Sequence, residues 1–382
     1  MPIATSPPRS DSYLFQPENI PTRAAFPTID AHNHLWDGWR AIPKFLRAMD
    51  RVGVAMTCDL TSNLRVSCDL TSNLRGSFVK AGYSFSTGDL DSFFTRCADR
   101  HPNRFYPFTT ATFSRPVSKP LFTDARAFAE ETCALLRDHV ARGARGLKIL
   151  KELGLHYRDG RGKLVPVDDE RLAPIWEEAG RLGVPVLIHQ SDPYGFFQPP
   201  GPRNEHTDTL RKYPSWSFSD RRRFPGKWEL IRRRDRLVAN HPNTQFILPH
   251  VANFPEHLDY VDALLAAHPN VAIDFSARLD EVGRQPHRAR AFFLHNQDRI
   301  LFGTDMPPSE AMYRCHFRFL ETFDEFFIPP DYDGTFGRHR WRISGIGLPR
   351  AVLKKLYFAN ILRLIPGLRP AYAAACQRLS AS

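Results

Sequence analysis

The stretch "TIDAHNHLWD" (residues 28–37) decides how this chain is interpreted, because it places two histidines one residue apart after a short apolar run. Side chains at positions i and i+2 of a strand point to the same face of that strand. His32 and His34 are therefore expected side by side, where a strand gives way to a loop. Taken alone, the pair also fits a polar loop with two unrelated histidines. Other parts of the sequence are needed to distinguish these two interpretations.

Seven further β-type runs follow the first one, and helical patterns separate most of them. The eight runs lie around residues 27–32, 52–60, 103–111, 144–150, 184–189, 244–250, 270–276 and 299–304. Helical patterns cover residues 122–143, 168–183 and 255–269, and two more at 308–327 and 348–364 finish the chain. Alternation of strand and helix indicates parallel βαβ units. The predicted fold class is α/β, a (β/α)8 TIM-type barrel with additional C-terminal helices.

The barrel is predicted to be a single domain of residues 26–382, preceded by an N-terminal extension of residues 1–25. The segment at about 190–226 is too long for a plain turn and contains many prolines and aromatic residues, so we expect a lid-like insertion. Residues 58–67 and 68–77 match at nine of ten positions. We interpret this tandem duplication as a lengthened surface loop without a function of its own.

Composition and charge are typical of a soluble globular protein, with 42% hydrophobic and 24% charged residues. No apolar run approaches the length of a membrane span, no hydrophobic signal segment begins the chain, and six scattered cysteines fit reduced thiols, so we expect a cytoplasmic protein. The net charge of +11 is compatible with a nucleic-acid partner. The most basic stretch, residues 219–236, nevertheless contains acids, and its second half resembles a helix with its arginines on the solvent face. No nucleic-acid motif accompanies it. We therefore predict no nucleic-acid or membrane partner, and attraction of an anionic small molecule as the use of the charge.

Polar side chains gather at the carboxyl ends of the predicted strands, the end at which barrels carry their active sites. In strand order, these ends supply His32 and His34, Lys148, His189, His250, Asp274 or Arg278, and Asp305. Imidazole and carboxylate are the ligands that zinc and similar ions prefer, and a catalytic site leaves one position open for water. Four histidines and a carboxylate at one end of four strands therefore predict a metal site.

The order of these residues resembles that of the amidohydrolase superfamily: HxH after strand 1, a histidine after each of strands 5 and 6, and "FGTD" (302–305) after strand 8. More narrowly, the chain is similar to the amidohydrolase-related branch that contains aminocarboxymuconate-semialdehyde decarboxylase and metal-dependent lactonases. The similarity extends from about residue 27 to 365 and includes "LPRAVLKKLYFANILRLI" (348–365), which resembles the C-terminal helix of that branch. The pattern is specific for fold and metal site and poorly specific for substrate.

The resemblance implies that His32, His34, His189 and Asp305 bind one divalent metal ion. Zn²⁺ is our first expectation and Mn²⁺ an alternative, because three histidines and an aspartate accept several ions. Zinc brings the pKa of its water from about 15.7 toward about 7. Asp305 would also take a proton from that water, and His250 would act beside it as a general acid or base.

Four further residues are candidates for substrate binding: Lys148, Arg203, Asn204 and Arg278. Lys148 has an alternative role, because binuclear superfamily members carry a carbamylated lysine after strand 4 that bridges two metals; we predict one metal. A guanidinium matches the geometry of a carboxylate, although an internal ion pair is the alternative for each arginine. Asp274 either orients a ligating histidine or caps the core.

The function that follows is hydrolysis of a lactone, amide or ester of a small, carboxylate-bearing substrate. Non-oxidative decarboxylation of an aromatic or unsaturated acid is the alternative, and the ligand set does not separate the two. Decarboxylases of this branch often carry Glu-x-His or Ala-x-His in place of HxH, which favours hydrolysis. A third hypothesis, a non-catalytic or nucleic-acid-binding barrel, is disfavoured because every ligand is present. The resemblance also suggests a homodimer.

Overall fold

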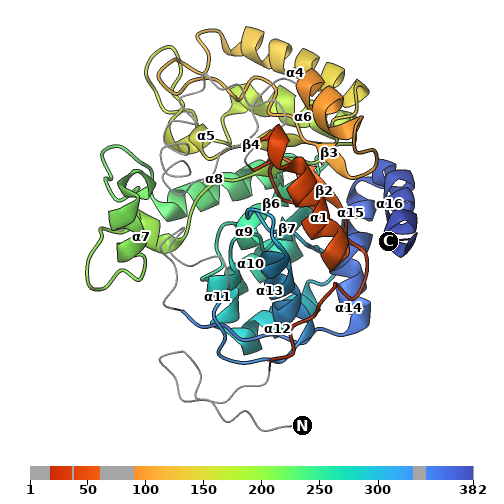
Figure 1. The fold of residues 1–382 in the computed structure, drawn as a ribbon. Coiled ribbons are helices and arrows are strands. Elements are labelled where there is room, and N and C mark those ends of the chain that lie inside the picture. The colour runs from red at the N-terminus through yellow and green to blue at the C-terminus, as the bar shows by residue number, and fades with distance from the viewer. Residues whose placement is uncertain (1–17, 37, 61–89, 330–340, 382) are drawn as a thin grey trace, which may run out of the picture.

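Short parallel strands form the centre of the molecule in the computed structural model, which describes residues 18–36, 38–60, 90–329 and 341–381 (Figure 1). They are β1 (Thr28–Asp30), β2 (Val54–Asp59), β3 (Phe105–Pro107), β4 (Leu147–Ile149), β5 (Val186–Ile188), β6 (Phe246–Leu248), β7 (Val271–Asp274) and β8 (Ile300–Leu301). Strands β1 to β3 pair in sequence order, and so do β4 to β8. Each strand lies inside one of the eight predicted runs.

Backbone hydrogen bonds join these two sets of strands into a barrel. Between β3 and β4, the amide of Lys148 donates to the carbonyl of Thr109 at 2.7 Å, and the amide of Thr109 donates to the carbonyl of Gly146 at 2.9 Å. Between β8 and β1, the amide of Ala31 donates to the carbonyl of Phe302 at 2.8 Å. The predicted (β/α)8 barrel is therefore confirmed.

All residues of the eight strands are buried, which is why the strands are nearly continuous apolar runs in the sequence. Leu187, Ile247, Ala272 and Leu301, from four neighbouring strands, belong to one apolar cluster. The predicted additional C-terminal helices contribute to the same cluster through Ile361, Leu362, Ile365, Leu368, Ala375 and Leu379. These helices therefore pack against the apolar interior of the barrel.

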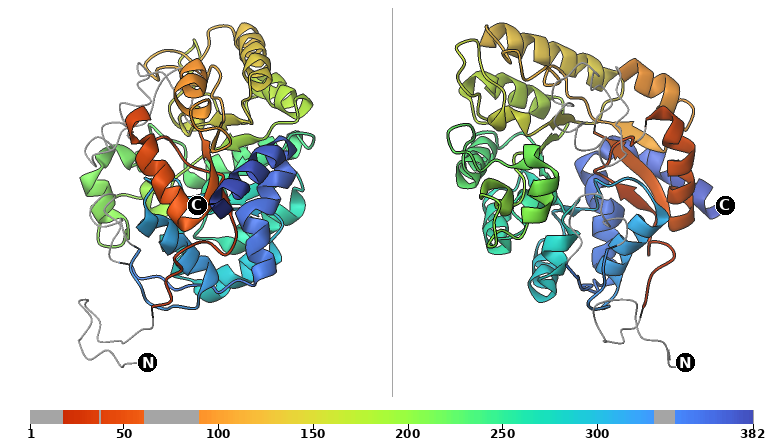
Figure 2. Two further views of the ribbon diagram at one scale, coloured as in Figure 1. Left: turned by 45° about the vertical axis from the view of Figure 1, so that its right-hand side comes forward. Right: turned by 60° about the vertical axis from the view of Figure 1, so that its left-hand side comes forward.

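Helices surround the strands (Figure 2). The longer ones are α1 (Ile42–Val52), α4 (Ala125–Ala141), α6 (Ala173–Arg181), α8 (Lys227–Asn240), α10 (Leu258–Ala267), α12 (Pro286–His295), α13 (Glu310–Glu321) and α16 (Arg369–Ala381). The shorter ones are α3 (Leu90–Phe93), α5 (Glu152–Leu155), α7 (Thr207–Lys212), α9 (Pro249–Ala252), α11 (Leu279–Gly283), α14 (Arg350–Lys354) and α15 (Asn360–Leu364). Side chains of Asp124 and Ser309 accept from backbone amides and so define the starts of α4 and α13.

Two of the predictions from the sequence concern residues that lie partly outside the described ranges. Residues 1–17 of the predicted N-terminal extension lie outside them, as do residues 61–77 of the tandem duplication. The end of the extension is attached to the barrel, because the amide of Asn19 donates to the carboxylate of Asp324 at 2.7 Å.

Within the described ranges the five cysteines are free thiols, and no helix combines the length and apolar character needed to cross a bilayer.

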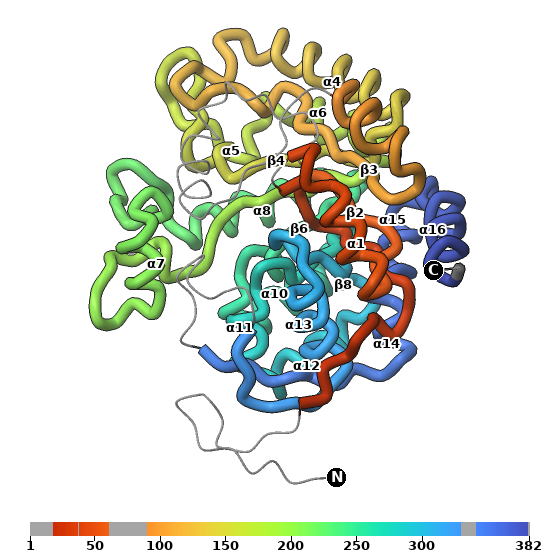
Figure 3. Tube along the Cα trace, in the orientation of Figure 1, coloured from red at the N-terminus to blue at the C-terminus, as the bar shows by residue number. Residues whose placement is uncertain are grey.

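Residues 190–226, the predicted lid-like insertion, leave the barrel after β5 and return to it at α8. Helix α7 lies within this segment, at one side of the molecule in Figures 1 and 3. The ring of Trp216 stacks 4.6 Å from that of Tyr213 and 6.0 Å from that of Phe196. The insertion thus has an aromatic cluster of its own; its action as a lid stays a prediction.

The basic stretch at 219–236 corrects one expectation. It enters α8 as predicted, but Arg234 does not lie on the solvent face: it is 0% exposed, and its neighbour Lys227 is 2% exposed. The guanidinium of Arg234 donates to the carbonyl of Ala252, beyond the end of β6. Long cationic side chains can reach under a helix to backbone carbonyls, and helical periodicity does not reveal such a reach.

Candidate metal centre

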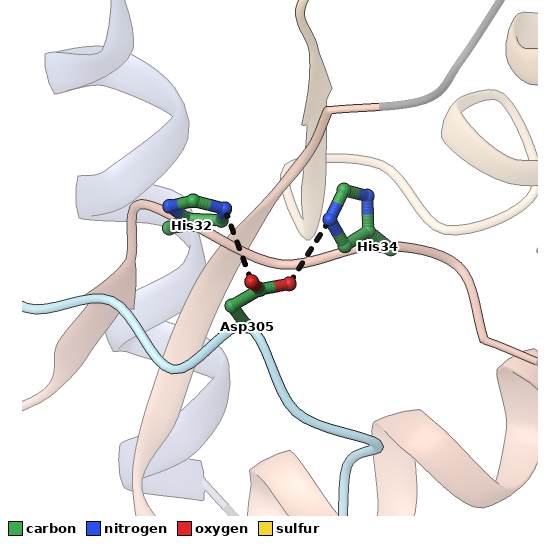
Figure 4. Close-up of side chains that lie close together, drawn as sticks. All are labelled: His32, His34 and Asp305. Carbon is green, nitrogen blue, oxygen red and sulfur yellow. Dashed lines mark ion pairs between the residues drawn. The ribbon is translucent and has the colours of Figure 1, made fainter. Parts of the chain in front are cut away.

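Two histidines and an aspartate meet where β1 and β8 end (Figure 4). The Nε2 atom of His34 lies 3.1 Å from one carboxylate oxygen of Asp305, and the Nε2 atom of His32 lies 3.7 Å from the other. One ligand atom from each of the three residues lies within 4.8 Å of the others. Nitrogen and oxygen atoms at such spacing can share one divalent cation.

A buried carboxylate joins the two loops that carry this cluster. Asp30, the last residue of β1, is fully buried and accepts hydrogen bonds from the hydroxyl of Thr304 at 2.6 Å and the amide of Asn33 at 2.9 Å. The hydroxyl of Tyr313 also donates to Asp30, at 3.0 Å. Burial raises the pKa of Asp30 to about 6, although these hydrogen bonds lower it. Because the loops after β1 and β8 share this acceptor, the side chains that they carry are held at a fixed spacing.

Asp274, at the end of β7, sets the tautomer of His32. The Nδ1 atom of His32 donates to one oxygen of Asp274 at 2.8 Å, and the hydroxyl of Ser276 donates to the other at 2.6 Å. With its proton on Nδ1, His32 presents the lone pair of Nε2 toward Asp305, as a metal ligand requires. Burial raises the pKa of Asp274, but His32 and Ser276 outweigh burial and the pKa is lowered. Of the two roles considered for Asp274, this geometry supports orientation of a histidine.

His250 lies beside the cluster, in a segment whose backbone has left-handed φ angles. Residues 250–253 have φ angles of 52° to 59°, a left-handed region that costs non-glycine residues about 1–3 kcal/mol each. The Nδ1 atom of His250 donates to the carbonyl of Ser276 at 2.8 Å. Its Nε2 atom lies 3.8 Å from Asp305 and has no hydrogen-bond partner among the described residues. Burial, and then the charge of Arg278, lower the pKa of His250 well below its ordinary value, so the ring is neutral at pH 7.

His189 lies next to the cluster but outside it. Its ring centroid is 4.5 Å from that of His250, while its Nε2 atom lies 3.4 Å from a carboxylate oxygen of Asp192. The other oxygen of Asp192 is paired with the ammonium of Lys151 at 2.5 Å. Burial lowers the pKa of His189 to about 4, so its ring is neutral and keeps a lone pair. Metal binding through Nε2 would require the ring to leave Asp192, and a ligand role for His189 stays a prediction.

Lys148 lies inside the barrel wall, because its two neighbours in β4 pack outward into the surrounding core. Burial lowers the pKa of Lys148 to about 8, although Asp305 and Asp274 raise it. For Asp305 the balance is opposite: burial raises its pKa, but His32, His34 and Lys148 outweigh burial, and the pKa lies below its ordinary range. Lys148 therefore acts on the cluster through its charge.

The three residues predicted to grip a carboxylate lie in different places. Arg278, after β7, is 3% exposed, and its Nε atom has no hydrogen-bond partner within the described part of the chain. Its guanidinium also lies 4.0 Å from Asp192. The amide of Asn204 donates to three backbone carbonyls of the insertion at 2.7 to 3.3 Å, so it holds that segment together. Arg203 is exposed on the insertion. Of the three, Arg278 offers a buried free donor beside His250.

Sequence reasoning missed the residues that hold these side chains in place: Asp30, Asn33, Lys151, Asp192, Lys227 and Ser276. A local signal existed for two of them, because "DAHNH" (30–34) alternates other polar residues with the histidines at the end of a buried strand. Lys151 and Lys227 carry no such signal, since their partners lie far from them along the chain.

The donor set fits a divalent metal ion. His32 presents Nε2 as an acceptor, and burial lowers the pKa of His34, so that ring is neutral as well. Asp305 adds an ionised carboxylate within 4.8 Å of both. Three ligands of this kind are what catalytic zinc sites use, with the remaining position left for water or substrate.

A family model described as amidohydrolase matches residues 29–366, a range that includes every candidate ligand. The chain belongs to the amidohydrolase family. Membership confirms the resemblance seen in the sequence and makes the protein an enzyme of a metal-dependent family. No curated protein matches this amidohydrolase.

Solved structures similar to this amidohydrolase cover most of its chain at low identity. The dihydroxybenzoic acid decarboxylase of Polaromonas sp. JS666, with bound manganese and the inhibitor 2-nitroresorcinol, has a TM-score of 0.50 and 14% identity over 89% of this chain and 97% of that chain. The 2,6-dihydroxybenzoate decarboxylase of Rhizobium has a TM-score of 0.49 and 18% identity over 89% and 99% of the two chains. An uncharacterized TIM-barrel protein of Bordetella bronchiseptica has a TM-score of 0.48 and 16% identity over the same shares. At 14% identity the likeness to the Polaromonas enzyme concerns the fold alone.

Proposed function

We propose that this amidohydrolase is a metal-dependent hydrolase that opens a lactone, amide or ester of a small, carboxylate-bearing substrate. The observation that carries the proposal is the cluster of His32, His34 and Asp305, whose ligand atoms lie within 4.8 Å of one another. His32, His34 and Asp305 would hold a divalent cation, which would lower the pKa of water toward neutrality and polarise a substrate carbonyl. One ion is proposed, with Zn²⁺ as the first candidate and Mn²⁺ as the second.

Residues of the chain supply the proton transfers. Asp305 has a pKa below its ordinary range, so it is ionised at neutral pH and can accept the proton of the attacking water. The Nε2 atom of His250, 3.8 Å from Asp305, can take up this proton and pass it to the leaving group. The ring of His250 keeps its orientation meanwhile, because its Nδ1 atom stays bonded to the carbonyl of Ser276.

Arg278 is proposed to bind the substrate carboxylate. Its guanidinium is buried beside His250 and has a free Nε donor, and charge-assisted hydrogen bonds to a carboxylate are among the stronger ones in proteins. Its partial neutralisation by Asp192 at 4.0 Å leaves a net attraction for an anion. Lys148, with its charge directed toward Asp305, remains the second candidate for this role.

Non-oxidative decarboxylation of an aromatic or unsaturated acid is the second candidate function. It uses the same cluster, and a buried arginine that binds a carboxylate suits it equally well. The similar solved structures named as dihydroxybenzoate decarboxylases direct the choice of test substrates. In this reaction His250 or Asp305 would deliver the proton to the substrate carbon from which CO₂ departs.

The test begins with metal content, measured by plasma mass spectrometry on the wild-type protein and on His34→Ala. About one equivalent in the wild type, lost in the variant, is the expected result. The loaded enzyme is then assayed for ring opening of carboxylate-bearing lactones and for CO₂ release from dihydroxybenzoates. CO₂ release without ring opening would replace the first candidate by the second. No metal after reconstitution with Zn²⁺ or Mn²⁺ would contradict both.

A further inference from the structure

A buried lysine joins the two loops that carry His189 and His250. Lys227, the first residue of α8, is 2% exposed, and its ammonium donates to the carbonyl of Asp192 at 2.5 Å and to the carbonyl of Asn253. Asp192 follows His189 by three residues in the loop after β5. Asn253 ends the left-handed run that begins at His250 after β6. One ammonium therefore bridges loops that leave two adjacent strands.

Helix formation by itself does not favour a lysine at this position. The first turn of a helix carries positive partial charge, which opposes a cation there, and burial of an ammonium is unfavourable without partners. The partners of Lys227 are the two carbonyls and the rings of Phe197 and Phe254, whose centroids lie 5.8 and 5.2 Å from the ammonium. Its contacts therefore serve the loops beneath α8.

Two further contacts tie the same region together. The backbone amide of Gln190 donates to the side-chain oxygen of Asn253 at 3.1 Å, which is a second link between the β5 and β6 loops. From the next turns of α8, Arg234 donates to the carbonyl of Ala252. The left-handed run at 250–253 is strained, so it needs such contacts to persist. Donors that bond its carbonyls stabilise the conformation in which His250 faces the cluster.

We propose that Lys227 is a positioning residue that holds His189 and His250 at a fixed spacing on the β5 and β6 side of the metal cluster. The inference rests on the proposed function, which gives these two histidines their roles. Without the ammonium, the carbonyls of Asp192 and Asn253 lose their common donor and the two loops can separate. Outer partners of metal sites are typically worth about 10–100-fold in metal affinity or activity.

The test compares Lys227→Met with Arg104→Met as a matched control. Arg104 is also 2% exposed and donates to two backbone carbonyls, those of Val54 and Ala55 at the start of β2, away from the metal cluster. Co²⁺ alone is the probe: its affinity is measured by titration calorimetry, and its geometry by the visible absorption spectrum. We expect both variants to lower the melting temperature. Only Lys227→Met should weaken Co²⁺ binding, by about 10-fold, and change the spectrum.

Lys227→Arg, which keeps the charge and several donors, is expected to restore part of the affinity. A folded Lys227→Met protein with wild-type Co²⁺ affinity and spectrum would overturn the positioning role. If that variant does not fold, Lys227→Gln, whose shorter side chain keeps an amide donor, takes its place; weaker Co²⁺ binding with an altered spectrum supports the proposal, and wild-type values overturn it. A wild-type protein that binds no Co²⁺ overturns the proposed function itself, and the role of Lys227 falls with it.

Discussion

The two halves of the candidate metal centre differ in the groups that hold them. In the β1/β8 half, the buried carboxylate of Asp30 accepts hydrogen bonds from both loops, and that of Asp274 accepts from His32 and also, at 3.1 Å, from the backbone amide of His250 in the other half. In the β5/β6 half, His189 and His250 are arranged by buried cations, of which Lys227 bonds backbone carbonyls of both loops. The first half already has its ligand atoms within 4.8 Å, whereas His189 in the second half faces Asp192.

The β1/β8 half is thus the preassembled part of the site, and the β5/β6 half is the part whose polar groups await a ligand. Gln190, Ser191 and Asn253, in the loops after β5 and β6, and Arg278, after β7, contain buried polar atoms without a hydrogen-bond partner among the described residues. Buried polar groups are normally hydrogen-bonded, so such atoms indicate where water, metal or substrate is accommodated. We infer that the β1/β8 half would bind the metal. The groups of the β5/β6 half would then rearrange around the water or substrate bound to that metal.

The largest expected effect concerns metal affinity in the two halves. His34→Ala should weaken Co²⁺ binding by more than about 100-fold, because a ligand of the preassembled half is worth more than the 10–100-fold of an outer partner. His189→Ala should cost only about 10-fold, since that ring must first leave Asp192. Titration calorimetry on both variants measures the ratio. Equal losses would abolish the distinction between the halves.

The next effect is on stability and belongs to Asp30. Its pKa is raised from 3.8 to about 6, so the fold favours the neutral carboxyl. The resulting stabilisation is complete below pH 3.8 and is lost as the pH rises through 6, an amount of about 3 kcal/mol. Asp30→Asn cannot titrate, so the wild type should lose about this much stability relative to the variant between pH 4 and 7.

Urea unfolding of the metal-free proteins at pH 4, 5, 6 and 7 checks the Asp30 prediction, with Glu152→Gln as a comparison. Burial raises the pKa of Glu152 from 4.5 to about 7, so its effect has the same sign but develops between pH 4.5 and 7. A wild-type minus Asp30→Asn difference that stays constant with pH would show that Asp30 is ionised throughout.

Arg278→Met should raise the KM for a carboxylate-bearing substrate by about 30-fold, since a hydrogen bond to a charged group is worth about 1.5–3 kcal/mol. The KM for the corresponding methyl ester should change much less, because no carboxylate remains to be bound. Steady-state kinetics with both compounds make the comparison. Equal increases for acid and ester would place Arg278 outside the substrate contacts and leave it a partner of Asp192.

The smallest effect is expected for Asn204→Ala. Its amide bonds three carbonyls of the insertion, so the variant should lose about 1 kcal/mol of stability and keep its Co²⁺ affinity. Thermal unfolding and calorimetry measure the two quantities. A large rise in KM with unchanged stability would instead restore the substrate-binding role predicted from the sequence.

Local patterns determine a large part of this protein. The eight apolar runs predict eight buried strands because a barrel strand is covered on both faces and its apolar character survives in the sequence. The barrel in turn predicts that His32, His34 and Asp305 share one end, because the carboxyl ends of parallel strands meet there. The sequence also predicts a helix in the second half of residues 219–236 with its arginines on the solvent face, but Arg234 in that helix is 0% exposed.

The sequence by itself therefore determined the fold, the family and the residues that gather at the mouth of the barrel, since these follow from periodicity and from motifs of adjacent residues. Only the tertiary structure decided which histidine faces Asp305 and which faces Asp192, and that Lys227 joins the two neighbouring loops. The physical reason is reach: a long side chain bonds a carbonyl or carboxylate far away along the chain. Such a bond depends on where the backbone has been placed, which no local pattern records.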